Sequence, residues 1–216
     1  MNKVFTKELR KKLYHGEEEF TIPNGFNIIG STAFQKCANL KRIIIPSTIG
    51  LIRKMAFWKC TALEEVIENF PYRQSCTISD RAFACCTNLR SIPFCGSLGK
   101  IGEKAFCNCE SLTMVSIKYG IQTISDGAFY GCTKLECINI PESVEYISWG
   151  AFAHCPNLRS VFIENMDCDI TQSSFDRARN EKMILYHDPV KNTYKQVNHI
   201  VRGGYYLITK KENCND

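Results

Sequence analysis

An Ala-Phe pair recurs along this chain every 23 residues, and this repeat constrains the fold more than any other feature of the sequence. The pairs are Ala33-Phe34, Ala56-Phe57, Ala82-Phe83, Ala105-Phe106, Ala128-Phe129 and Ala151-Phe152, with Ser174-Phe175 one period further on. The spacing lengthens once, to 26 residues, between the second and third pairs. A fixed period in this range is typical of stacked supersecondary units and not of a globule around one closed core.

Four columns of each unit follow the spacing of a short helix. An Ile four residues before the Ala, the Ala itself, a Cys and a Leu fall at i, i+4, i+8 and i+11, which is one face of a helix. Six of the seven units have a Ser, Thr or Gly after this Ile, and these residue types commonly cap a helix N-terminus: Gly30, Ser79, Gly102, Ser125, Ser148 and Thr171. The pattern predicts one or two helical turns in every unit.

A second pattern in each unit predicts a strand. β-branched residues alternate by two, as at Ile43 and Ile45, and Pro46 follows where a strand can end without its missing N–H. Eight such positions run from Phe20 to Tyr186, which at about 4.8 Å per strand makes a stack roughly 34 Å long. The predicted fold is therefore an α/β repeat solenoid.

The repeat also divides the chain. Residues 1–19 carry Leu9 and Leu13 among charged residues and are predicted to form an N-terminal cap with a short amphipathic helix. Residues 20–187 hold the repeats of about 23 residues, and the 26-residue unit is expected to bulge over residues 69–76. Residues 188–216 are predicted to be a degenerate C-terminal repeat or cap, with a strand near residues 205–209.

Composition narrows the classes of function. The net charge of +5 is scattered, and no basic run with interleaved aromatic residues points to nucleic acid. No apolar stretch approaches the ~18 residues of a transmembrane helix, so no membrane insertion is expected. The N-terminus lacks the apolar region of a signal peptide, which leaves two alternatives: a protein that works inside a cell, or a piece of a longer secreted protein.

The thirteen cysteines are interpreted mainly as structural. Six occupy the repeat column, where Cys acts as a small buried hydrophobe: Cys37, Cys60, Cys86, Cys109, Cys132 and Cys155. The odd count and the lack of a C-x-x-C pair disfavour a disulfide framework and a zinc site. The best metal candidates, Cys85-Cys86 and Cys107-x-Cys109, each include a column residue, so no metal is predicted. Unpaired cysteines favour a reducing compartment.

The assembled motif closely resembles the BspA-like leucine-rich repeat, also called the Treponema-type repeat. The best match is Leu135-x-x-Ile138-x-Ile140-Pro141-x-x-Val144-x-x-Ile147-x-x-x-Ala151-Phe152-x-x-Cys155, and the resemblance covers roughly residues 20–187. It implies a leucine-rich repeat solenoid with parallel strands on the concave face and short helical turns on the convex face. It also implies a surface protein that acts in adhesion and binding, and it supplies no catalytic residues.

No constellation for catalysis is present in the sequence, so neither an enzyme nor a cofactor is predicted. The predicted function is instead a protein-binding module that contacts a protein ligand through the concave sheet; the alternative is a structural spacer within a larger surface adhesin. Outward strand positions are unusually apolar, which marks a partner site or reflects strand propensity alone. The predicted partner-binding residues are Ile44, Ile67, Met114, Ser116, Asn139, Phe162 and Leu185.

Overall fold

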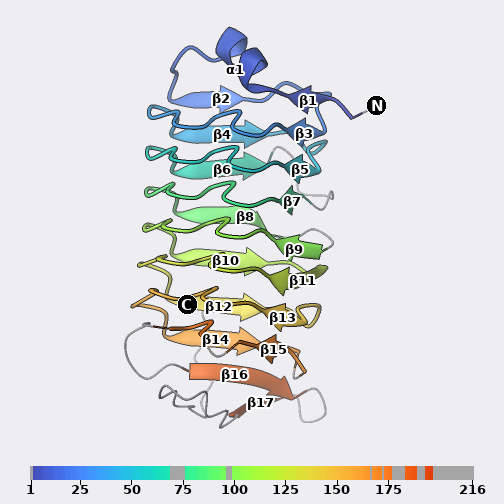
Figure 1. The fold of residues 1–216 in the computed structure, drawn as a ribbon, viewed down its shortest axis with the longest axis vertical. Coiled ribbons are helices and arrows are strands. Elements are labelled where there is room, and N and C mark those ends of the chain that lie inside the picture. Colours follow the sequence, from blue (N-terminus) through green and yellow to red (C-terminus); the bar gives the residue numbers. More distant parts are fainter. Residues whose placement is uncertain are drawn as a thin grey trace.

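The chain forms a solenoid of stacked coils (Figure 1). The computed structural model describes residues 2–68, 76–95, 99–165, 167–171, 173–176, 183–188 and 193–196. Each complete coil passes through a long strand, a short strand and a segment of turns, and the coils follow one another along the long axis of the molecule. The predicted repeat solenoid is confirmed, and its regular part consists almost entirely of strands and turns.

The long strands stand at the eight predicted positions. They pair in parallel in two groups, β2-β4-β6 and β8-β10-β12-β14-β16, and the break between the groups falls at the 26-residue unit. Core residues align from coil to coil, as Ile43 does with Val66. The bounds are β2 (Glu19–Thr21), β4 (Arg42–Ile45), β6 (Glu65–Glu68), β8 (Ser91–Cys95), β10 (Met114–Ile117), β12 (Cys137–Ile140), β14 (Ser160–Ile163) and β16 (Met183–Asp188).

A second sheet runs beside the first and was not predicted. Except for the first, its short strands contain the Ile column that the sequence pattern assigned to a helix face, and these Ile side chains point into the core, as Ile52 and Ile147 do. The strands are β1 (Val4–Phe5), β3 (Ile28–Ile29), β5 (Leu51–Ile52), β7 (Thr77–Ile78), β9 (Gly99–Ile101), β11 (Ile121–Ile124), β13 (Tyr146–Ile147) and β15 (Asp169–Ile170).

The predicted helical turns are wrong: turns occupy the Ala-Phe-x-x-Cys segments. Positive φ recurs just before the Ala and just before the Cys, at Thr32 (57°) and Lys36 (59°) in the first unit, and an α-helix cannot contain such residues. Alternate N–H groups donate to the next coil, as Phe34 does to the Ala56 carbonyl at 2.7 Å. The backbone is thus satisfied between coils instead of within a helix.

Phenylalanine rings form the centre of the core. Phe106 is fully buried between Phe83 and Phe129, with ring centroids 5.4 Å and 5.3 Å away, as the repeat register predicts. The rings of successive units are nearly parallel, and the ladder extends from Phe34 to Phe175. Leu, Ile, Ala and Cys columns surround it, so one continuous core passes through all the coils.

The N-terminal segment extends the stack as well as covering it. The predicted cap helix is present as α1 (Lys7–Leu13), with Thr6 as its N-cap. Before it, β1 pairs with β3, and Phe5 stacks on Phe34 at 5.5 Å, which adds a ring to the ladder outside the sequence repeat. Leu9 packs partly against the core.

At the other end the chain reverses direction. After β16, β17 (Thr193–Gln196) pairs with it antiparallel, whereas a further coil would place a parallel strand there. A strand that returns beside the last one covers its edge, as a terminal cap does. The predicted strand near residues 205–209 lies outside the described residues, as does all of the predicted bulge over residues 69–76 except Cys76.

Candidate functional site

The candidate binding surface is the outer side of the long strands, referred to here as the long-strand face. Side chains alternate along each strand, so Ile43 and Ile45 point into the core while Ile44 between them points outward. Parallel register places the outward residues of successive coils side by side: Thr21, Ile44 and Ile67 in one run, and Ser116, Asn139, Phe162 and Leu185 in the other.

Exposure differs along this face. Met114 is 59% exposed, Ser116 and Asn139 are exposed, and Ile44 and Ile67 are half-buried. These residues are therefore accessible where the sequence pattern placed them. The backbone of β16 puts Leu185 beside Phe162, while the Leu185 side chain lies outside what the structure describes.

The expected exposure of Phe162 is wrong. Its side chain is only 7% exposed, although it is not part of the continuous core. The register still places it beside Asn139 on the outer side of the sheet. The apolar patch predicted around Phe162 is therefore not open at β14.

Charged residues occupy the edge of the face nearest α1. The Arg42 Nε donates to the Glu19 carboxylate at 2.6 Å, and the Lys41 ammonium lies 2.7 Å from the Glu18 carboxylate. Each pair joins neighbouring coils, but exposed pairs of this kind contribute only about 0–1 kcal/mol to stability. Their main effect is on the polarity of the surface, because they place opposite charges next to the half-buried, apolar Ile44.

The cysteine column has a role that sequence reasoning missed. Each thiol from the second unit onward donates to the Phe carbonyl of the preceding coil, at 2.9–3.3 Å: Cys60 to Phe34, Cys86 to Phe57, Cys109 to Phe83, Cys132 to Phe106 and Cys155 to Phe129. Burial raises the pKa of the Cys60, Cys86, Cys109 and Cys132 thiols above the usual value. Cys60, Cys86, Cys109 and Cys132 are buried and form no disulfide, as predicted.

Comparison with known proteins decides the family. A model of the BspA type Leucine rich repeat region matches residues 13–99 and 76–197, in six copies. A solved T. pallidum Leucine Rich Repeat protein (TpLRR) is 30% identical, with a TM-score of 0.62 over 68% of this chain and 70% of that one. The chain belongs to the BspA-type leucine-rich repeat family.

Two further solved structures are similar to this BspA-type chain over part of their length. A leucine rich cell surface protein from Faecalibacterium prausnitzii is 25% identical over 69% of this chain, with a TM-score of 0.48. The Pneumococcal vaccine antigen PcpA is 15% identical over 91%, with a TM-score of 0.50. This chain spans only 48% and 42% of those two chains. Among curated proteins, none matches the sequence.

The described part of this BspA-type chain holds no group of three or more metal-ligating side chains. Of the cysteines weighed as metal ligands, Cys86 and Cys109 donate to backbone carbonyls, and Cys85 and Cys107 are half-buried. No helix among the residues that the structure describes could span a bilayer. Besides its faces, the described part of the fold has a pocket near α1.

Proposed function

We propose that this chain is a non-catalytic, protein-binding leucine-rich repeat module and that the long-strand face contacts the protein ligand. The observation that carries the proposal is the register of that face. Within β2-β4-β6, and again from β10 to β12, its outward residues are aligned from coil to coil and are accessible or half-buried. A surface held by a continuous core is preorganised, so little ordering entropy opposes binding.

The chemistry of the face favours a protein over other partners. Half-buried Ile44 and Ile67 offer apolar contact near the Arg42–Glu19 ion pair, and exposed Met114, Ser116 and Asn139 continue the surface. Apolar residues beside polar and charged groups suit a protein interface, in which an apolar centre has a polar rim. Both signs of charge are present, which disfavours a polyanion such as nucleic acid on this face.

A structural spacer is the second candidate. It is favoured by the uninterrupted ladder of Phe rings, because each coil contacts only its neighbours and such an array holds its ends at a fixed separation. A spacer needs no surface for contact with a partner. A binding module does need one, so substitutions on that face alone should abolish binding.

The proposal is tested with variants of one face. Proteins captured on the immobilised chain from cell-surface extracts are identified, and their affinities are then measured by surface plasmon resonance. Ser116→Arg with Asn139→Arg should weaken binding at least ~30-fold, the scale of an interface hot spot, and leave the circular dichroism spectrum unchanged. Trp149→Ser is the matched control, since Trp149 is 61% exposed and follows a short strand.

Two results would count against binding through this face. If the double variant keeps its affinity for the captured protein and Trp149→Ser loses it, the partner binds the turn side of the coils. Capture of no protein above the level of a blank matrix would instead favour the spacer.

A further inference from the structure

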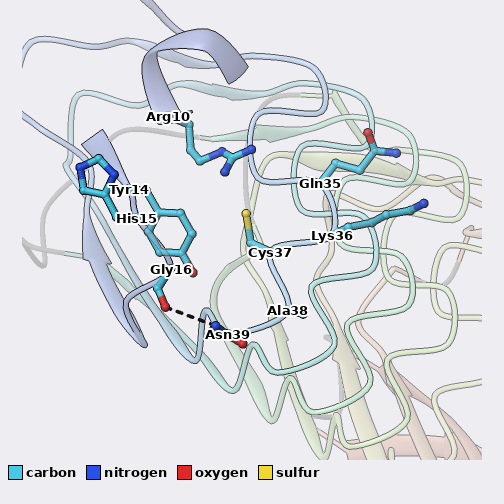
Figure 2. A pocket seen from close by; sticks show the side chains of 9 residues that line it. All are labelled: Arg10, Tyr14, His15, Gly16, Gln35, Lys36, Cys37, Ala38 and Asn39. Atoms are coloured by element: carbon cyan, nitrogen blue, oxygen red, sulfur yellow. Dashed lines mark hydrogen bonds between the residues drawn. The ribbon is translucent and has the colours of Figure 1, made fainter. Parts of the chain in front are cut away.

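A pocket of about 360 Å³ lies between the N-terminal cap and the first coil (Figure 2). Its walls come from the end of α1, the residues that follow the helix, and the first segment of turns: Arg10, Tyr14, His15, Gly16, Gln35, Lys36, Cys37, Ala38 and Asn39. This volume is within the range of small-molecule sites. Figure 2 shows Arg10, Tyr14 and Cys37 around the centre, with His15 on one side and Lys36 on the other.

The pocket exists because the first coil has no coil before it. In later coils the Ala carbonyl accepts the Phe N–H of the preceding coil, as Ala56 accepts from Phe34 at 2.7 Å. For the Ala33 carbonyl that donor is replaced by the Arg10 Nε, at 3.1 Å. The Arg10 side chain thus lies where the turn segment of a preceding coil would otherwise pack, and the space beside this side chain remains open.

Tyr14 brings an unused donor to this pocket. The side chain is only 6% exposed, and its ring packs against Phe20 and Phe34 at 5.6 Å and 6.4 Å. Its hydroxyl oxygen is buried and has no hydrogen-bond partner among the described residues. Burial raises the pKa of Tyr14 to about 12, so the group stays protonated. Buried polar groups without partners are rare in proteins and call for a ligand or a water molecule.

The pocket is also positively charged. Arg10, Lys36 and His15 are basic, and no Asp or Glu is among the lining residues. Residues 1–60 carry eleven Lys and Arg against four Glu, a net charge of +7, whereas the whole chain carries +5. Two of these Glu residues are paired with Lys41 and Arg42, and the Glu17 carboxylate accepts the His15 backbone N–H at 2.8 Å beside the pocket. The field at this end of the solenoid therefore attracts anions.

We propose that this pocket binds a small anion that carries a carboxylate or phosphate group, with the Tyr14 hydroxyl and the Arg10 guanidinium as donors to its oxygens. Lys36 adds positive charge at the rim, and a guanidinium with free N–H groups suits either oxyanion. The site does not depend on the proposed function of the long-strand face.

The test uses the full chain with inorganic phosphate and acetate as separate probes. Binding is followed by two-dimensional NMR, which should show saturable shifts at Tyr14, Cys37 and Asn39 for at least one anion. Tyr14→Phe should lower the affinity for that anion at least about tenfold, because one charge-assisted hydrogen bond is lost. Without the anion, the same variant should melt at the same or a higher temperature, because it removes a buried group that has no partner.

Lys11→Gln is the matched control, since Lys11 is an exposed cation on α1 that does not line the pocket. It should change the affinity less than about twofold, as expected for an exposed charge screened by salt. Three results would overturn the proposal: no saturable shift with either probe, equal affinity in Tyr14→Phe and the wild type, or equal losses in Lys11→Gln and Tyr14→Phe. The probe that binds more tightly identifies the anionic group.

Discussion

At the scale of single residues, the Phe and Cys of each unit depend on one another. The Phe57 carbonyl accepts the Cys60 N–H at 3.1 Å from its own coil and the Cys86 thiol at 3.1 Å from the next. Both lone pairs of a fully buried carbonyl are thereby used. A thiol is small and apolar enough for the core and still donates, which a methyl group cannot do. The Cys column therefore joins coils as well as filling space.

Phe106→Ala should destabilise the fold by about 3–5 kcal/mol, because the ring is fully buried between two others and its loss leaves a cavity. Lys134→Ala, at an exposed residue one unit further along, should change the free energy of unfolding by about 0.5 kcal/mol or less. Urea unfolding followed by circular dichroism measures both variants. Similar losses in the two would contradict the assigned register.

At the scale of elements, the turn segments replace helices because their hydrogen bonds run to the neighbouring coil. Residues before the Ala and the Cys take left-handed conformations, and only some are Gly, as at Gly127 and Gly131. A left-handed residue other than Gly costs about 1–2 kcal/mol, so the strain is offset by packing between coils. The turns are therefore stable only within the stack.

The backbones of neighbouring coils come into close contact at Gly102. A Cβ added there would lie 2.5 Å from the Asp80 nitrogen and from the Ser79 carbonyl carbon, both of them backbone atoms that cannot move aside alone. Gly102→Ala should cost about 1–3 kcal/mol through overpacking, whereas Ser125→Ala, at the same position one unit later, should cost less than about 0.5 kcal/mol. Thermal unfolding compares them, and an unchanged melting temperature for Gly102→Ala would refute the contact.

At the scale of the whole molecule, the core is a set of parallel columns and not a closed centre. Phe, Ile, Leu, Ala and Cys columns run together from the first Ala-Phe unit to the sixth, so each coil is stabilised by the two beside it. The ends are closed differently: Phe5, Tyr14 and Arg10 cover the first coil, and β17 lies against β16. Because the same contacts recur in every coil, a change of pH that affects one buried thiol affects the equivalent thiols of the other coils as well.

The thiol column should make the fold sensitive to alkali. The Cys60, Cys86, Cys109 and Cys132 thiols have raised pKa values when folded, so their contribution to stability is complete below the unfolded thiol pKa of about 8.5 and is lost as the pH rises above it. Each thiol should remove about 1.4 kcal/mol of stability per pH unit in that window.

Urea unfolding between pH 8 and pH 10 tests this expectation. The free energy of unfolding should fall steeply in the wild type and less steeply in the double variant Cys86→Ala with Cys109→Ala, which has two fewer titrating thiols. Equal slopes in the two proteins would show that other groups control the alkaline response.

The sequence by itself determined the solenoid. The 23-residue period, the eight long strands and the buried Phe, Leu, Ala and Cys columns all follow from it, because stacked units must repeat their core residues in register. The same reasoning located the outward residues Ile44, Met114 and Asn139, since alternation along a strand leaves no other side for them.

Only the tertiary structure decided between helix and turn. The spacing of four from Ile29 to Ala33 to Cys37 buries all three residues in either form, and the choice depends on hydrogen bonds to a coil 23 residues away. Phe5 and the pocket beside Tyr14 were likewise hidden, because they lie where the repeat ends and have no periodic signal. A local pattern records which residues are buried, whereas backbone pairing and the closure of the ends depend on neighbours that the pattern does not contain.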